Sequence, residues 1–383
     1  MDLCAIRNRI RKRRKNSAFW DSVACALGYT SIYYVKYIYK IPCMTSFQKV
    51  ENWMHEMLTG HEKCCFNMFR MTRCTFRQLC IDLESKYGLL PSERMSILEK
   101  VGLFVYILSK AQSNRDAHER FQHSGETVSR IFKEVLDAMD GLSRDILRPR
   151  DPEFKEIPSQ IVDDTRYMPH FKRINCDIEE GKEHLHFDLL FTYVLTGWEG
   201  SAHDSRIFLD TIGNPSLNFP KLPPGKYYLV DKGYPEREGY LTPYHKKRYH
   251  QTEFHGAIPR GPREIFNRAH SSLRSCIERS FGILKARWEI LRTMPKYSLQ
   301  DQNRIVCACF ALHNYIRLSK VPDPGFKIID EDPTFIPPEV SMDVECGSTQ
   351  EVQRVSTNEM TKVREEITTS LMRSRRRRRR RSS

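Results

Sequence analysis

A short strand that ends in an acidic residue, followed by a long helix that carries another, most constrains how this chain can fold. Residues 225–235 read Gly-Lys-Tyr-Tyr-Leu-Val-Asp-Lys-Gly-Tyr-Pro. They predict a strand over Tyr227 to Val230, because its aromatic and branched residues stop at a turn of glycine and proline. Asp231 then stands at the carboxyl end of the strand. Open α/β sheets place their ligand crevices at this end, so we expect Asp231 to face a site.

The second acidic residue lies on a helix that the apolar spacing predicts over residues 270–291. Apolar residues recur there at intervals of three and four: Leu273, Ile277, Phe281, Leu284, Trp288 and Leu291. Arg274, Glu278 and Gly282 form the neighbouring stripe. A glycine inside a helix costs about 1 kcal/mol relative to alanine, so we expect another group to approach closely at Gly282. We also expect Asp231 and Glu278 to meet at one point.

Two or three carboxylates that converge are typical of two-metal phosphoryl transfer. Two divalent ions about 3.5 to 4 Å apart stabilise the attacking and leaving oxygens of that reaction. Hard oxygen ligands favour Mg²⁺ or Mn²⁺. From the spacing alone, a structural alternative stays open, in which Asp231 caps a turn and Glu278 is solvated or paired with an arginine.

The composition supports globular cores and a polyanionic partner. The chain has 383 residues, enough for two domains with tails, and 40% of them are hydrophobic. Its formal net charge of +14 favours association with nucleic acid, although a merely basic surface is an alternative. The 12 cysteines contain no Cys-x-x-Cys pair, which argues against a zinc ribbon and favours small buried residues in a reducing compartment.

Two basic segments near the ends of the chain favour the nucleus, with the cytoplasm as a second compartment. Residues 7–15 read Arg-Asn-Arg-Ile-Arg-Lys-Arg-Arg-Lys, and residues 375–381 are an unbroken arginine run. Such clusters are typical of nuclear import signals or of arms that bind nucleic acid, and a solvated, disordered leader is the alternative for the first. The uncharged stretch 22–35 is too short and too rich in tyrosine and serine for a membrane span, so no membrane partner is expected.

Residues 46–145 are predicted to form an all-α domain after a basic, aromatic leader over residues 1–45. A helix that ends near Phe121, a turn at Ser124-Gly125 and a second helix indicate a helix-turn-helix-like pair. Ser124 and Thr127 can cap the second helix. This helix can present polar side chains to DNA: Glu126, Ser129, Arg130 and Lys133. A helical hairpin without a DNA role is the alternative.

The rest of the chain is predicted to be a linker, an α/β domain and a tail. Residues 146–160 are rich in proline and charge, as a linker is, and residues 319–383 are polar enough for a disordered tail that ends in the arginine run. Between them, residues 161–318 contain a stretch, 186–197, with apolar residues on both faces. Such a pattern is typical of a strand inside a sheet.

Seven sequence blocks occur in a fixed order between residues 160 and 318. They are RYMPHFK (166–172), FTYVLTGWEGSAHDSR (191–206), GKYYLVDKGYP (225–235), PYHKKRYH (243–250), EIFNRAHSSLR (264–274), IERSFGILK (277–285) and ALHN (311–314). Together they resemble the Harbinger (PIF/Harbinger) transposase-derived nuclease family of the DDE superfamily. The helical segment before them is similar to the domain that precedes the nuclease in plant-type members.

The resemblance implies an RNase H-like fold, a central sheet flanked by helices, with an Asp-Asp-Glu triad that binds two divalent cations, Mg²⁺ or Mn²⁺. By position, Asp231 is similar to the second acid and Glu278 to the third. His203 and Asp204 lie in a block that resembles the family's Gly-Ser-x-His-Asp motif, and we assign them to support of the site. The residues expected to bind nucleic acid are Arg130, Lys133, Arg274 and Lys285.

One block of the family is missing from this chain. In the family, Gly-x-Ile-Asp-Gly-Thr-His follows the Pro-x-Phe-Lys motif and supplies the first acid, but no such block occurs here. Asp177 is the nearest substitute for this metal ligand. We therefore expect the first strand of the sheet to be missing too, and the site to hold two cations poorly.

The sequence thus predicts a transposase-derived, divalent-metal-dependent nuclease that acts on DNA phosphodiester bonds and is impaired by loss of the first catalytic acid. The alternative is a non-catalytic relic of a transposase that binds DNA or protein. The family also suggests a separate Myb-like protein as a partner that supplies DNA recognition.

Overall fold

The computed structural model describes residues 3–39, 48–149, 151, 157, 159–180, 183–198, 204–220, 222–254, 257–319, 321–332 and 358–381. The chain falls into two compact units, Met1–Gln48 and Lys49–Ser383. The first unit contains α1 (Leu3–Tyr33) and a π-helical turn, η1 (Tyr34–Ile38), with large aromatic side chains in solvent. Within the described ranges, no helix combines the length and the apolar character needed to cross a membrane.

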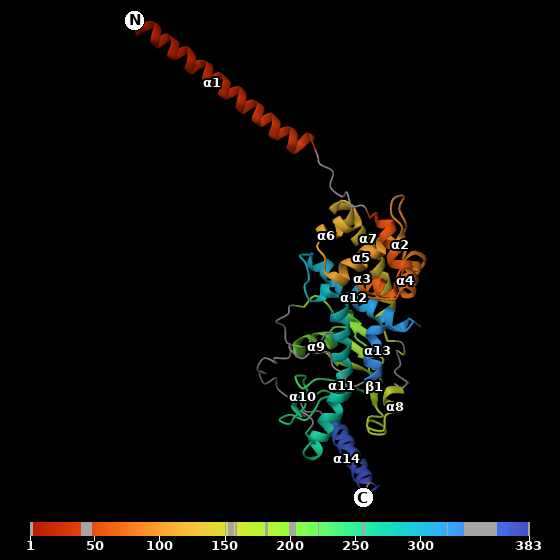
Figure 1. Cartoon of the computed structure of the whole chain (residues 1–383). Coiled ribbons are helices and arrows are strands. Elements are labelled where there is room, and N and C mark those ends of the chain that lie inside the picture. The colour runs from red at the N-terminus through yellow and green to blue at the C-terminus, as the bar shows by residue number, and fades with distance from the viewer. Residues whose placement is uncertain are drawn as a thin grey trace. The chain divides into compact units, whose positions relative to one another are not determined.

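The second unit begins with the helices that the apolar spacing predicts (Figure 1). They are α2 (Val50–Thr59), α3 (Glu62–Phe69), α4 (Arg73–Tyr87), α5 (Ile97–Lys110), α6 (Asn114–Phe121) and α7 (Gly125–Ile146). The predicted cap of α7 is confirmed, because the Ser124 hydroxyl accepts a hydrogen bond from the Thr127 N–H at 3.2 Å. The apolar face of α7, including Val128, Ile131 and Val135, is buried in the core.

A five-stranded sheet follows the short helix α8 (Ser159–Val162). Its strands are β1 (Ile174–Glu180), β2 (Glu183–His186), β3 (Phe191–Val194), β4 (Tyr227–Leu229) and β5 (Tyr240–Leu241). They lie in the order β3-β2-β1-β4-β5. The pairs β1–β2 and β2–β3 are antiparallel, and the pairs β1–β4 and β4–β5 are parallel. The sheet is therefore mixed, with β1 between the two kinds of pairing.

The structure corrects the expectation that the first strand is missing. β1 contains Asp177, which pairs with His186 of β2, and Ile178, which pairs with Leu229 of β4. Because β1 ends in acidic residues, its sequence lacks the apolar alternation that predicts a strand. Hydrogen bonds to two neighbouring strands nevertheless hold it in the sheet. The predicted strand over residues 186–197 is also divided, since Leu189 adopts a left-handed conformation with φ of 70° between β2 and β3.

The remaining helices lie between and after the strands along the chain. They are α9 (Asp204–Gly213), η2 (Pro215–Leu217), α10 (Gln251–Phe254), α11 (Gly261–Arg287), η3 (Glu289–Leu291), α12 (Leu299–Leu318), α13 (Pro324–Glu331) and α14 (Asn358–Arg381). Alternate residues of β4 enter different clusters: Tyr227 and Leu229 join the main core, whereas Tyr228 packs with Phe208 of α9. The side chain of Asp231 follows the alternation of Tyr227 and Leu229, which directs it to the face that α11 covers.

The predicted helical and nuclease-like domains share one continuous core instead of forming separate units. The core cluster extends from Val50 to Leu371. Polar contacts also join the two regions: Tyr315 of α12 donates to Asp82 of α4 at 2.6 Å, and Arg304 of α12 pairs with Asp140 of α7 at 2.8 Å. The expected linker, 146–160, has residues 150, 152–156 and 158 outside the described ranges.

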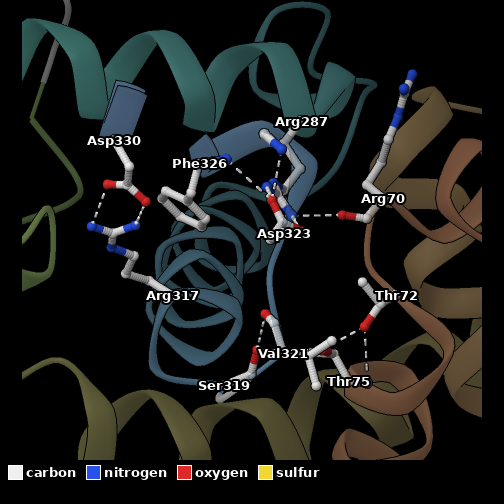
Figure 2. Close-up of polar contacts among 11 residues, drawn as sticks. Arg70, Thr72, Thr75, Arg287, Arg317, Ser319, Val321, Asp323, Phe326 and Asp330 are labelled. Atoms are coloured by element: carbon white, nitrogen blue, oxygen red, sulfur yellow. Dashed lines mark hydrogen bonds and ion pairs between the residues drawn. The ribbon is translucent and has the colours of Figure 1, made fainter. Parts of the chain in front are cut away.

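Arg287, at the end of α11, makes further contacts between the helical region and the nuclease-like region. Its guanidinium donates to the carbonyl oxygen of Arg70, just after α3, at 2.7 Å, and to Asp323 at 3.0 Å (Figure 2). The Asp323 carboxylate caps α13 through the N–H of Gly325 at 2.9 Å. Arg287 and Asp323 each have only 4% of the side chain exposed, so α3, α11 and α13 are tied at one buried point.

The C-terminal stretch differs from the expected disordered tail. α13 and α14 lie within it, and residues 333–357 are outside the described ranges. α14 packs on α11 and β5, with Met360, Ile367 and Leu371 buried (Figure 1). Its apolar residues are sparse but fall at spacings of seven and four, which is enough to place them on one face of a helix.

Candidate active site

Asp231 and Arg274 form the centre of the candidate site. Asp231 follows β4, and the Nη1 atom of Arg274 lies 3.2 Å from its Oδ1 atom. The side chain of Arg274 is 7% exposed and that of Asp231 is 34% exposed, so the carboxylate faces solvent and the guanidinium lies beneath it. The end of β4 and α11 therefore meet through this ion pair.

Glu278 lies one helical turn beyond Arg274 and is partly buried. Burial raises its pKa above the ordinary value; Arg274 and His250 oppose this rise, and the negative charge of Asp231 adds to it. For Asp231, burial also raises the pKa, but Arg274 outweighs it with help from the Lys232 N–H, and the pKa lies below the ordinary value. The two carboxyl groups are therefore close enough to affect each other's ionisation.

Hydrogen bonds from the first half of α11 fix this arrangement. His270, one turn before Arg274, is fully buried, and its Nε2 atom lies 2.9 Å from the carbonyl oxygen of Leu241. A carbonyl can only accept, so Nε2 carries the proton and Nδ1 accepts from the Tyr249 hydroxyl at 3.2 Å. Burial lowers the pKa of His270 to about 3, so the imidazole is neutral. His270 thus holds α11 against the end of β5.

Asn267 adds a second attachment. Its side-chain oxygen accepts from the Tyr244 N–H at 2.8 Å, and its amide donates to the carbonyl oxygens of Tyr244 at 3.0 Å and Arg248 at 3.1 Å. Neither Asn267 nor His270 was assigned a role from the sequence. The signal that could have found them is their spacing with Arg274 and Glu278, which places all four near one stripe of α11.

The carboxylates of Asp231 and Glu278 provide part of the oxygen ligand set that a hard cation prefers. Glu278 lies one turn from the arginine that pairs with Asp231, and a divalent ion bound by these carboxylates would favour their ionised forms. Among the described residues, no group of three or more His, Cys, Asp or Glu side chains could hold a metal ion. Asp177 lies on β1, one residue before the partner of Leu229, but its side chain is outside the described part of the structure.

The other predicted residues are distributed over the fold. His203 lies outside the described residues, and Asp204 is the first residue of α9, with its side chain likewise not described. Arg130 is 54% exposed on α7 and pairs with Glu134 at 2.7 Å, and Lys133 is exposed on the same helix. Lys285 is partly buried on α11. Arg274 was expected to bind nucleic acid, but it is buried under Asp231, so its role is internal to the site.

Comparison with known families identifies the class of this region. Residues 186–314 match the family model of the DDE superfamily endonucleases, and residues 45–140 match that of a domain of unknown function. The first match supports the DDE transposase-derived superfamily and includes Asp231 and Glu278, but it begins after Asp177. No curated protein and no solved structure matches the chain.

Proposed function

We propose that this chain is a transposase-derived nuclease of the Harbinger type, which uses divalent cations to cut DNA phosphodiester bonds. The observation that carries the proposal is the ion pair of Asp231 with Arg274, one helical turn before Glu278, inside the region that matches the DDE endonucleases. The mixed sheet, with α11 packed on the face toward which Asp231 points, is compatible with the RNase H-like fold of such enzymes.

Each described residue has a distinct part in the proposed chemistry. Arg274 holds the pKa of Asp231 below its ordinary value and so favours its ionised form, whereas burial raises the pKa of Glu278. His270 and Asn267 hold the helix that carries both Arg274 and Glu278. A divalent cation, when bound, would supply stabilisation of the negative charge that develops on the phosphate. Mg²⁺ and Mn²⁺ are the cations that carboxylate oxygens favour.

We assign the first acid of the triad to Asp177. β1 lies directly beside β4, and Asp177 adjoins Ile178, whose partner Leu229 is two residues before Asp231. The backbone of β1 therefore brings a third carboxylate-bearing residue to the strand next to the site. His203 and Asp204 stay assigned to its support, and Asp204 is the first residue of α9.

A non-catalytic relic that binds DNA or protein is the second candidate. It is favoured by the ion pair of Asp231 with Arg274, because a guanidinium that already neutralises this carboxylate reduces its affinity for a metal. DNA is the partner of the nuclease and one of the two partners of the relic, and both candidates have the nucleus as their compartment, in keeping with the basic segments of the chain. A Myb-like protein that supplies DNA recognition is a further proposed partner.

Nicking of supercoiled plasmid DNA by the full chain, with Mg²⁺, Mn²⁺ or EDTA, tests the nuclease proposal. We expect cleavage only with metal, and a loss of more than about 100-fold for Asp231→Asn, Glu278→Gln and Asp177→Asn, since even groups that only orient metal ligands contribute about 10- to 100-fold. Glu289→Gln, a change at a partly exposed carboxylate that pairs with Arg292, is the matched control.

The pattern of losses separates the two candidates. Cleavage that survives Glu278→Gln would show that Glu278 is not a catalytic acid. Full cleavage by Asp177→Asn, with loss in the other two variants, would remove Asp177 alone from the assignment. Absence of cleavage by the parent protein with either metal, together with DNA binding, would favour the relic.

A further inference from the structure

A basic pocket lies between α11, α14 and the segment before β1, away from the candidate active site. Its volume is about 480 Å³. The polar side chains that line it are three arginines, four hydroxyl groups and one imidazole: Arg166, Arg268, Arg375, Thr165, Tyr167, Ser272, Ser374 and His170. No carboxylate belongs to its described lining, so the pocket has a positive charge and several hydrogen-bond donors. This is the chemistry that recognises phosphate groups.

The pocket and the candidate active site use opposite sides of α11. Ser272 precedes Arg274 by two residues, and residues two apart on an α-helix point in nearly opposite directions. Arg268 and Ser272 are one turn apart and share the pocket side. A ligand in this pocket would therefore not compete with a cation at Asp231.

The three arginines are not equally neutralised. Arg166 pairs with Asp164 at 2.6 Å, which cancels much of its charge. Arg268 lies over the Phe254 ring, with 5.9 Å between the guanidinium carbon and the ring centroid, a contact that leaves its positive charge intact. Arg375 is the first residue of the arginine run on α14. Arg268 and Arg375 are therefore the two main cationic groups of the pocket.

α14 is held against the body of the protein by contacts upstream of the arginine run. Arg364 pairs with Glu236 at 3.0 Å, and the hydroxyls of Thr368 and Tyr244 are 3.1 Å apart. The side chain of Ser370 reaches the Nδ1 atom of His170 at 2.7 Å. Because these contacts extend to within five residues of Arg375, the start of the arginine run has a fixed position beside the pocket.

The repulsion among the arginines of the run favours the binding of an anion along it. Seven consecutive arginines on a helix place like charges at spacings of three and four, which is unfavourable. The C-terminal end of a helix dipole offsets only part of this repulsion. A polyanion that lies along the end of α14 would offset the rest.

We propose that the pocket and residues 375–381 form one surface, the α14 basic surface, which binds the phosphodiester backbone of DNA. Arg268 and Arg375 contact phosphates at the pocket, and Arg376, Arg377 and Arg380 continue the contact along the same strand. The proposal takes DNA as the partner from the proposed function. It adds a binding surface whose main element, α14, lies outside the region matching the DDE endonucleases.

Binding of a fluorescent DNA duplex of arbitrary sequence, measured by anisotropy in EDTA between 50 and 200 mM salt, tests this surface without any cleavage. The logarithm of the binding constant falls with the logarithm of salt concentration by about 0.9 for each phosphate contact. We expect Arg268→Ala/Arg375→Ala to lower this slope by about 2 and to weaken binding about 10-fold or more. Arg292→Ala/Lys327→Ala, which removes the same charge elsewhere, should leave both nearly unchanged.

A second variant separates a docked helix from a flexible basic tail. Ile367→Asn/Leu371→Asn removes the apolar anchor of α14 but keeps every arginine. We expect it to weaken binding as much as the charge variant does, because the run is no longer held beside Arg268. A thermal unfolding midpoint near that of the parent confirms that the rest of the protein is folded.

Two results would overturn the proposal. The first is an unchanged slope for Arg268→Ala/Arg375→Ala, and the second is full affinity after undocking of α14. Either leaves the nuclease proposal intact if the parent protein still cuts plasmid in a Glu278-dependent way. Conversely, loss of binding by these variants in a protein that never cuts DNA would support the α14 basic surface and remove the nuclease proposal.

Discussion

Two fully buried, neutral histidines are expected to make this protein sensitive to mild acid. Burial lowers the pKa of His270 to about 3, and it lowers that of His313 to about 3 as well. His313 lies on α12, where its Nε2 atom is 2.9 Å from the carbonyl oxygen of Leu189, so it donates as His270 does. In the unfolded chain both imidazoles would titrate at about 6.5.

The sign and size of the effect follow from these values. As the pH falls below about 6.5, the unfolded chain gains protons that the folded chain does not, so the free energy of unfolding decreases until about pH 3. At pH 5 the loss is about 2 kcal/mol for each histidine, and the limit near pH 3 is about 5 kcal/mol each. A loss of about 4 kcal/mol at pH 5 is a large part of the 5 to 15 kcal/mol typical of a folded domain.

Urea unfolding at pH 7 and pH 5 measures this loss for the parent, His270→Gln and His313→Gln. Glutamine keeps one donor and one acceptor but does not titrate, so each variant should lose about 2 kcal/mol less than the parent between the two pH values. His55→Gln, at an exposed histidine, controls for the loss of an imidazole. A parent and a His270→Gln variant with the same pH dependence would refute the reasoning for that residue.

Three further substitutions test contacts that hold the fold. Asn314→Ala removes the amide that accepts from the Phe191 N–H at 2.9 Å and should lower the unfolding free energy by about 2 to 3 kcal/mol, measured in urea. Arg287→Met leaves Asp323 as a buried charge, so a loss of about 3 to 5 kcal/mol is expected in the same assay, and a loss below 1 kcal/mol would contradict the buried pairing. Ser124→Ala removes the cap of α7 and should cost about 1 kcal/mol, seen as a lower thermal midpoint.

Local patterns in the sequence predicted the parts of the fold that depend on local physics. The cap at Ser124 depends on only four consecutive residues, and the structure confirms it. The meeting of Asp231 with the helix that bears Glu278 followed from the end of one strand and the period of one helix. Burial of Arg274 did not follow, because an arginine on a polar stripe looks solvent-exposed until its partner strand is in place.

The parts that the sequence did not predict depend on distant partners. β1 was expected to be absent, since the family block that supplies the first acid does not occur in this chain, yet its hydrogen bonds to β2 and β4 place it in the sheet. α14 was expected to be disordered, but three widely spaced apolar residues join the main core, and Arg364 pairs with Glu236, 128 positions away in the sequence. In both cases the stabilising contacts are with residues that no local pattern can identify.

Because of the contacts of Arg287, α11 is attached to the rest of the fold near both of its ends. Near its start, Asn267 and His270 attach it beside β5, and at its last residue Arg287 ties it to the backbone just after α3. Glu278 lies between these two attachment points. A fragment of residues 186–314 would lose the partners of Arg287. We therefore expect the nuclease-like region not to fold stably without the helices that precede it in the chain.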